Sequence, residues 1–325
     1  MRATAYAGVA LATAAVVIGV ATTAASTHAA PRAPVPTGGM PVPLRQQWLG
    51  NQNLVRTWQI GYRAFNGQRR AAFVVLPRWY SPQNNPPLPL VISPHGRGIE
   101  PQANAGLFGN LPALGPFALV SPEGAGVHLE LYAWGAPGDI ADLARMPAIV
   151  MHALPWLRIA PHRIYAVGGS MGGQETLLLV AEHKQMLAGA AALDSPTNLA
   201  ARYAAFRKLP NGIGLQRLAR LEFGGIPRTR HDAYADRSPL FFAHDLAESM
   251  VPLQIWWSTR DQIVVNQAGE SGLLYRAIKR LNPNAPVTQV VGSWNHSAEM
   301  YAFTRLPIVL ARMGLVRLAA TGTNI

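Results

Sequence analysis

The stretch Arg163–Val180, with the sequence RIYAVGGSMGGQETLLLV, decides how the rest of the chain is interpreted. The β-branched and aromatic run Ile164–Val167 predicts a buried strand, and the run Gln174–Val180 predicts a buried helix. Between them lies Ser170, flanked by glycines in the pattern G-x-S-x-G. A strand, a glycine-flanked serine and a helix, in that order, are typical of a sharp turn that exposes a nucleophilic hydroxyl.

Three glycines, Gly168, Gly172 and Gly173, explain how such a turn forms. Side chains at these positions would collide with the strand and the helix, whereas glycine also tolerates unusual φ and ψ angles. The turn directs the first N–H groups of the helix toward whatever the serine attacks. A flexible glycine loop without chemistry is the competing interpretation, and the flanking strand and helix argue against it.

Composition excludes several classes of site. The chain has 325 residues, enough to bury the core of one large domain or two small ones. It has no cysteine, which excludes a thiol nucleophile, a disulfide framework and cysteine metal sites. The net charge is +12, but the basic residues are scattered rather than gathered in a dense run. We therefore expect solvated surface charge and no nucleic-acid partner.

Residues 1–29 have the layout of a secretory signal peptide. Arg2 precedes the apolar run Tyr6–Val20, and small residues follow up to a small-x-small site at Ala29. An uncleaved membrane anchor is the alternative, but the apolar run is short for a membrane span. The sequence predicts a secreted or cell-envelope protein with no stable membrane insertion.

The remainder divides into a spacer and one domain. Residues 30–43 are rich in proline and glycine and predict a disordered linker. Residues 44–325 form the predicted domain. Within it, residues 200–250 are polar and show no strand, which indicates a cap or lid inserted between two strands. Ordinary surface helices without a gating role are the alternative.

Strand-like and helix-like runs alternate along the domain. The predicted strands are 55–62, 71–77, 88–93, 117–120, 164–167, 187–193, 253–258 and 287–291, and the main predicted helices are 139–157, 174–180 and 298–313. Asn66-Gly67 predicts a hairpin turn between the first two strands, and Pro147 predicts a kink or a break in its helix. The alternation predicts an α/β fold: a mostly parallel sheet with helices on both faces.

These features resemble the α/β-hydrolases, which are serine hydrolases built on an eight-stranded sheet. The resemblance covers Leu44–Met313. The run Ile159–Tyr165 leading into the turn resembles secreted esterases of the polyester-depolymerase and feruloyl-esterase type, and also the catalytic domain of prolyl-oligopeptidase-like proteins.

The segment Pro94–Gly98, PHGRG, resembles the oxyanion loop of that superfamily. It departs from the triple-glycine form of many lipases, because Arg97 stands where the second glycine would be. The resemblance implies that the backbone N–H groups of Arg97 and Met171 form the oxyanion hole. His95 is expected to brace this loop through hydrogen bonds.

The superfamily order of serine, acid and histidine implies a catalytic triad of Ser170, Asp261 and His296. Asp261 follows a predicted strand and precedes His296 by about 35 residues, as the resemblance implies. Two other residues remain candidates for the acid of the triad. Asp194 ends the strand that follows the helix after Ser170, and Asp245 lies in the predicted cap.

The sequence also gives expectations about ligands. Trp134 and Trp294 are predicted to line the substrate pocket, although core packing is an alternative. The histidines outside the predicted triad show no metal-ligand spacing, so no metal is expected. A triad and an oxyanion hole supply all the chemistry, so no cofactor is expected either.

The sequence therefore predicts a secreted serine hydrolase, with a carboxylesterase acting through an acyl-enzyme as the first hypothesis. Its partner would be a small-molecule or polymeric ester. A prolyl-oligopeptidase-like peptidase is the neighbouring alternative. A non-catalytic α/β-hydrolase-like protein that binds a small ligand is the alternative from a different class.

Overall fold

The computed structural model describes residues 43–44, 54–125 and 134–318. The predicted signal peptide and all of the predicted linker except Pro43 lie outside these residues. Among the helices described, none has the length and apolar character needed to cross a membrane.

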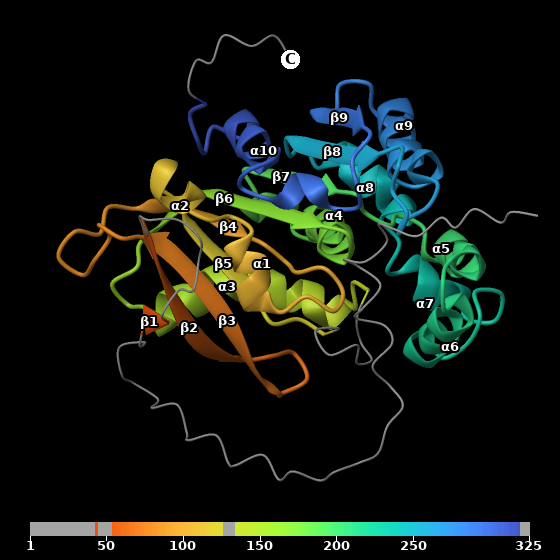
Figure 1. Cartoon of the computed structure of the whole chain (residues 1–325), viewed down its shortest axis with the longest axis horizontal. Coiled ribbons are helices and arrows are strands. Elements are labelled where there is room, and N and C mark those ends of the chain that lie inside the picture. Colours follow the sequence, from red (N-terminus) through yellow and green to blue (C-terminus); the bar gives the residue numbers. More distant parts are fainter. Residues whose placement is uncertain (1–42, 45–53, 126–133, 319–325) are drawn as a thin grey trace, which may run out of the picture. The chain divides into compact units, whose positions relative to one another are not determined.

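A single sheet runs through the domain (Figure 1). Its strand order is β1-β2-β3-β5-β4-β6-β7-β8-β9. The strands are β1 (Pro43–Leu44), β2 (Val55–Arg63), β3 (Arg69–Pro77), β4 (Leu88–Ile92), β5 (Ala118–Pro122), β6 (Ile159–Gly169), β7 (Gly189–Leu193), β8 (Leu253–Ser258) and β9 (Val287–Gly292). Pairing is antiparallel from β1 through β3 to β5, and parallel from β5 through β4 and β6 to β9. The mostly parallel sheet is confirmed, and its eight predicted strands gain the two-residue β1 at one edge.

The predicted hairpin joins β2 and β3. The Ala64 N–H donates to the Gln68 carbonyl at 2.9 Å, and Gly67 takes a φ of 79° that favours glycine. Arg63 pairs with Arg69 directly across the turn. The Asn-Gly dipeptide therefore sets the register of both strands.

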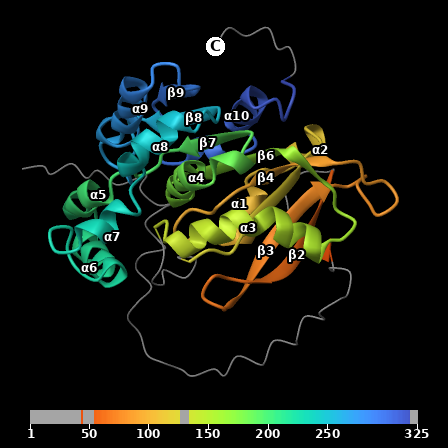
Figure 2. The ribbon, with the colours of Figure 1, turned by 180° about the vertical axis from the view of Figure 1, so that it is seen from behind.

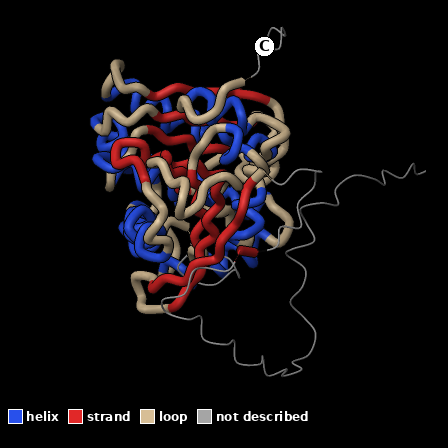
Figure 3. The backbone as a smooth tube through the Cα atoms, turned by 90° about the vertical axis from the view of Figure 1, so that its left-hand side faces the viewer, coloured by secondary structure: helices blue, strands red, loops and turns tan. Residues whose placement is uncertain are grey.

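Helices cover both faces of the sheet, and Figure 3 shows the strands between them. They are α1 (Pro101–Gly106), α2 (Leu111–Leu114), α3 (Pro137–Ala153), α4 (Met171–Glu182), α5 (Leu199–Ala205), α6 (Gly212–Phe223), α7 (His231–Ala235), α8 (Ala243–Glu248), α9 (Ser271–Leu281) and α10 (Leu306–Arg312). One apolar cluster joins α3, α4, α8 and α9 to Leu90 and Ile92 of the central strand β4. The other joins α1, α2 and α10 to Val91. Alternate residues of β4 thus face opposite layers, which explains why this strand is apolar throughout.

Two predicted helices differ from the structure. α3 stays one helix of 17 residues with Pro147 inside it, so the predicted break does not occur. The predicted final helix is divided into a 3₁₀ turn, Ala298–Met300, and the short α10. Pro307 lies in the first turn of α10, where no intrahelical hydrogen bond needs its missing N–H. Inside a continuous helix the same residue would remove a hydrogen bond, which favours a new helix start here.

The segment between β7 and β8 is helical, and it has two parts. α5, α6 and α7 form one group apart from the helices that cover the sheet, as Figures 1 and 2 show. This group has its own apolar cluster, in which Phe206, Phe223 and Tyr234 pack with Trp134 and Met171. α8, in contrast, packs on α4 and α9. Only α5–α7 therefore form an insertion outside the sheet layers, and we refer to these helices as the insertion.

Glu270, just before α9, ties the start of the insertion to the sheet layers. Its Oε2 accepts hydrogen bonds from the backbone N–H groups of Thr197 and Asn198, at 2.8 and 2.7 Å, and from the Thr197 hydroxyl at 3.1 Å. Burial raises the pKa of Glu270, and these donors oppose that rise.

Replacing Glu270 by Ala should therefore lower the free energy of unfolding by about 3 kcal/mol, because three buried donors lose their acceptor. The exposed Glu248 of α8 provides the control, since Glu248→Ala should cost less than about 0.5 kcal/mol. Urea denaturation of the three proteins measures both effects. Equal stabilities of the two variants would contradict this anchoring role.

Candidate active site

The candidate site lies at the carboxyl edge of the parallel strands. Ser170 follows β6, Asp194 follows β7, Asp261 follows β8 and His296 follows β9. Because these strands are adjacent and parallel, the loops after them meet at one edge of the sheet. Residues more than 100 positions apart in the sequence are brought together in this way.

Ser170 has an unusual backbone conformation. Its φ of 56° and ψ of −125° lie outside the regions that L-residues normally adopt. The Ser170 N–H donates to the Leu193 carbonyl at 2.8 Å, and the Ser170 carbonyl accepts from the Gln174 N–H at 3.0 Å. Hydrogen bonds to β7 on one side and within α4 on the other therefore hold the turn, and Ser170 is half-buried.

The glycines around Ser170 have no room for a side chain. A Cβ on Gly172 would lie 2.1 Å from the Pro94 carbonyl oxygen, and one on Gly173 would lie 2.1 Å from the Ser195 hydroxyl. A Cβ on Gly169 would approach Met300 to 2.8 Å and the Ser297 hydroxyl to 3.2 Å. The turn thus packs against three loops, including the loop that carries His296.

His296 is hydrogen-bonded to Asp261. The His296 Nδ1 lies 2.8 Å from Asp261 Oδ2, which makes Nδ1 the donor to a carboxylate and leaves Nε2 as the other ring nitrogen. Asp261 accepts three more hydrogen bonds, from the N–H groups of Ile263 and Val264 and from the Gln267 amide. Burial alone would raise the pKa of Asp261, but His296 and these donors outweigh burial and hold it below its usual value.

Asp194 lies next to this pair but has a different role. Its Oδ1 accepts from the Ser258 N–H at 2.8 Å, and its Oδ2 accepts from the Ser297 N–H at 2.8 Å and the Trp294 indole at 3.1 Å. Ligand atoms of Asp194, Asp261 and His296 lie within 4.8 Å of one another. Asp194 therefore braces the loop on both sides of His296, whereas Asp261 contacts the imidazole itself.

Glu299 is a buried acid that the sequence did not reveal. It is fully buried, and neither carboxyl oxygen meets a hydrogen-bond donor among the described residues. Burial, and next the neighbouring Asp194 carboxylate, raise the pKa of Glu299 to about 10. At neutral pH Glu299 is thus protonated, so it adds no further negative charge beside Asp194. Only its position three residues after His296 could have hinted at this contact.

The predicted oxyanion loop lies against the elbow, which is the turn at Ser170 between β6 and α4. A Cβ on Gly96 would be 3.9 Å from the Ser170 Cβ. His95 Nδ1 donates to the Gly96 carbonyl at 2.8 Å, while its Nε2 accepts from the Gly124 N–H at 3.1 Å. Burial lowers the pKa of His95, so the neutral ring is favoured. His95 braces the loop, as expected.

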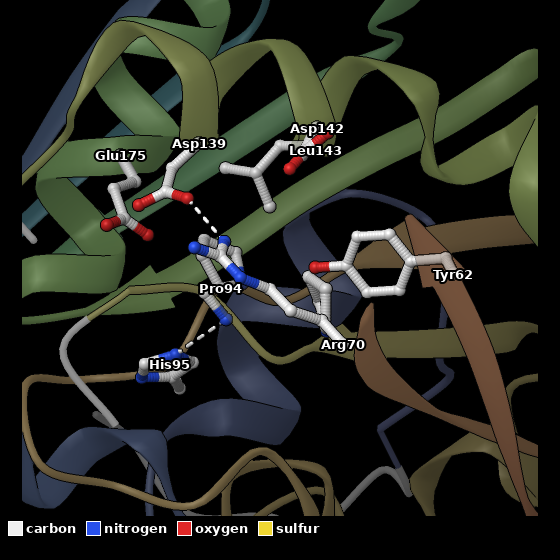
Figure 4. Close-up of a pocket in the computed structure, with 10 residues that line it drawn as sticks. Tyr62, Arg70, Pro94, His95, Asp139, Asp142, Leu143 and Glu175 are labelled. Atoms are coloured by element: carbon white, nitrogen blue, oxygen red, sulfur yellow. Dashed lines mark hydrogen bonds and ion pairs between the residues drawn. The ribbon is translucent and has the colours of Figure 1, made fainter. Parts of the chain in front are cut away.

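A small pocket lies behind this loop, lined by Tyr62, Arg70, Pro94, His95, Pro122, Gly124, Asp139, Asp142, Leu143 and Glu175. Figure 4 shows the carboxyls of Asp139 and Glu175 near the Arg70 guanidinium. The Arg70–Asp139 ion pair is 2.6 Å long and buried. Burial raises the pKa of Asp139 and, more strongly, that of Glu175. Arg70 and Asp139 thus pair behind the loop, with the buried Glu175 close to them.

The other predicted site residues take different positions. The Trp134 indole is buried beside the elbow and contacts both the Arg97 guanidinium and Phe223, while the Trp134 backbone N–H donates to the Met171 sulfur at 3.4 Å. The Trp294 indole donates to Asp194 and packs in the core with Met300 and Trp256, so the structure shows the core packing that was the alternative for this residue. Asp245 is exposed on α8 and lies outside the group of acids around His296.

Gly172→Ala should lower the free energy of unfolding by about 2–3 kcal/mol, because the new methyl group must displace the Pro94 backbone. Gly214 of α6 is the control: a Cβ there meets nothing within 4 Å. Gly214→Ala should stabilise the protein by about 0.5 kcal/mol, since alanine favours a helix. The shift in Tm of each variant relative to the wild type gives the sign of its stability change. A destabilised Gly214→Ala protein, or an unaffected Gly172→Ala protein, would contradict the described packing.

Glu299→Gln should stabilise the protein more at pH 8 than at pH 5. The unfolded chain releases the Glu299 proton near pH 4.5 while the folded chain keeps it to about 10, so wild-type stability falls as pH rises between these values. Glutamine cannot titrate and escapes this loss, which should amount to about 4 kcal/mol between pH 5 and pH 8. Urea denaturation at both pH values measures it, and a pH-independent difference would show that Glu299 is ionised in the folded protein.

No protein-family model matches the sequence, and no curated protein sequence is similar to it. Solved structures, however, are similar in three dimensions. The acylaminoacyl peptidase of Pyrococcus horikoshii matches 83% of this chain with a TM-score of 0.62 at 15% identity, and the chain spans 43% of that protein.

Two esterases match over most of both chains. The Pyrobaculum calidifontis esterase has a TM-score of 0.61 at 16% identity, over 80% of this chain and 85% of that one. Carboxyl esterase 2 of Tuber melanosporum has a TM-score of 0.59 at 18% identity, over 83% and 87%. At such identities the likeness is one of fold. Together with the strand order and the elbow, it shows that this chain has the α/β-hydrolase fold.

Proposed function

We propose that this protein is a secreted serine hydrolase that cleaves carboxylic esters through an acyl-enzyme. The observation that carries the proposal is the 2.8 Å hydrogen bond between His296 Nδ1 and Asp261, located at the same sheet edge as the strained Ser170. That bond sets the tautomer in which Nε2 can accept a proton.

In the proposed reaction, the Ser170 Oγ attacks the ester carbonyl carbon while His296 Nε2 takes the hydroxyl proton. The ionised Asp261 stabilises the imidazolium that forms. The carbonyl oxygen becomes an oxyanion, and the N–H groups of Met171 and Arg97 donate to it. Met171 is the first residue of α4, so its N–H belongs to the helix terminus that favours negative charge.

The tetrahedral intermediate then collapses, and His296 returns the proton to the departing alcohol. Water attacks the acyl-enzyme in the second half of the cycle, with His296 again as the base, and releases the acid and free Ser170. Each half-reaction begins and ends with the same protonation of the triad. No group outside these residues is needed to balance protons or electrons.

The ester preference is part of the proposal. Esterases that are similar in fold share most of their length with this chain, whereas the chain spans less than half of the peptidase. Secretion is proposed from the sequence of residues 1–29.

Purified protein should react with a fluorophosphonate probe, and the label should disappear in Ser170→Ala. Such a probe marks a serine that a base and an oxyanion hole activate. Ester hydrolysis should fall by at least about 10⁴-fold in kcat in the same variant. A folded wild-type protein that neither labels nor hydrolyses any ester would support ligand binding without catalysis instead. Cleavage of peptide amides in preference to matched esters would favour a peptidase.

The two acids beside His296 should respond differently. Asp261→Asn should lower kcat by about 10³–10⁴-fold, because it removes the partner that orients and stabilises the imidazole. Asp194→Asn retains a similar shape and leaves the imidazole bonded, so its loss should be nearer tenfold. Steady-state kinetics of the two isosteric variants tests the assignment. A larger loss in Asp194→Asn would make Asp194 the acid of the triad.

A further inference from the structure

Arg97 belongs to the loop that packs against the turn at Ser170. It follows Gly96, where a Cβ would lie 3.9 Å from the Ser170 Cβ. The Arg97 guanidinium lies over the Trp134 ring, with Cζ 4.1 Å from the ring centroid. The Trp134 carbonyl in turn accepts from the Gln174 amide of α4 at 2.9 Å. Arg97 is therefore held against the first turn of the helix that follows Ser170.

The Arg97 guanidinium has no hydrogen-bond partner in the part of the chain that the structure describes. Its Nε, Nη1 and Nη2 atoms are all buried, and all lack an acceptor there. Burial lowers the pKa of Arg97, although only to about 10, so the group is charged at neutral pH. A buried cation with unused N–H donors is rare in proteins and calls for an explanation.

Other buried arginines of this protein are balanced. Arg70 pairs with Asp139 at 2.6 Å, and Arg237 pairs with Glu222 at 2.8 Å. Arg202 of α5 is buried over Phe206, and the nearby Glu270 and Asp261 carboxylates offset its charge. Arg97 is attracted by Glu222, but one oxygen of that carboxylate is bonded to Arg237. Within the described ranges, the positive charge of Arg97, on the loop that packs against Ser170, is thus left without a hydrogen-bonded carboxylate.

The geometry of the group indicates what it binds. A guanidinium presents its N–H donors in a planar fork that matches a carboxylate, and stacking on an indole engages its face but satisfies none of those in-plane donors. One unbalanced cation suits one negative charge, whereas a phosphate monoester would bring nearly two. We infer that the Arg97 side chain binds a carboxylate of the substrate, so that the preferred substrates are esters that also carry a carboxylate group. This inference rests on the proposed function for the bond that is cleaved.

Two matched pairs of esters test the inference on the full chain. para-Acetoxybenzoate and its methyl ester differ by a carboxylate on the alcohol side of the cleaved bond. Monophenyl adipate and its methyl ester differ by a carboxylate on the acid side. In at least one pair the wild-type kcat/KM should be about tenfold or more higher for the anionic ester. The pair that shows the preference tells on which side of the bond the carboxylate lies.

In Arg97→Gln the ratio of kcat/KM for the anionic ester to kcat/KM for its methyl ester should fall to about one. Arg97→Lys should give an intermediate ratio, because lysine retains the charge without the planar fork of donors. The ratio is the readout because both esters of a pair use the same backbone oxyanion hole. Arg305→Gln is the matched control: Arg305 also stacks on an indole, that of Trp294 at 4.8 Å, but it is exposed. Its ratio should equal that of the wild type. Equal ratios in wild type and Arg97→Gln would overturn the inference.

Binding separates this inference from the proposed function. Titration calorimetry of Ser170→Ala with para-acetoxybenzoate and monophenyl adipate, and with the methyl ester of each, needs no turnover. Preferential binding of an anion that Arg97→Gln abolishes would support the carboxylate site even if no ester were hydrolysed. If Ser170→Ala binds neither anionic ester in preference to its methyl ester, the carboxylate site is refuted, whether or not the wild type is an esterase. Circular dichroism confirms that each variant is folded.

Discussion

The chain must leave β6 and enter α4 within a single residue, and the positive φ of Ser170 is the result. The residues around it are shaped by that turn. Gly172 allows the oxyanion loop to approach through Pro94, and Gly173 allows the loop after β7 to approach through Ser195. Gly169 gives the same freedom to the loop of His296. The strain of one residue is offset by close contacts from three sides, and those contacts bring the candidate functional groups together.

Three carboxyl groups share the space around His296, and they coexist because they differ in protonation. Asp261 is ionised, with its four acceptor positions filled by N–H donors. Asp194 is bonded to three N–H donors of its own. Glu299, which has none among the described residues, retains its proton. Burial and the Asp261 charge raise the pKa of Asp194, and His296 and the N–H donors of Asp194 oppose that rise, whereas Glu299 lacks such donors and its pKa rises to about 10.

Local patterns predicted much of this structure. The Asn66-Gly67 turn and the strand–serine–helix run are determined by short stretches of sequence, so the hairpin and the elbow were predictable. The resemblance supplied His296 and Asp261, which no local pattern connects. Glu299 could not be predicted, since its protonation depends first on its burial in the folded chain and then on Asp194, a residue 105 positions earlier in the sequence. The same holds for the Trp294 indole, whose position depends on a bond to Asp194 rather than on its own neighbours.

The Trp134 ring contacts the Arg97 guanidinium and also stacks with Phe223 of the insertion. The insertion keeps its aromatic cluster apart from the two clusters that pack on the sheet. Changes among its helices can therefore reshape the surroundings of Arg97 through the Trp134 indole and leave the strands as they are, as long as the contacts with Met171 of the elbow and the charge of Arg202 near Asp261 are kept. Such a division lets natural selection vary recognition while reactivity is preserved, and a protein engineer could exploit it by exchanging α5–α7 with Arg202 retained.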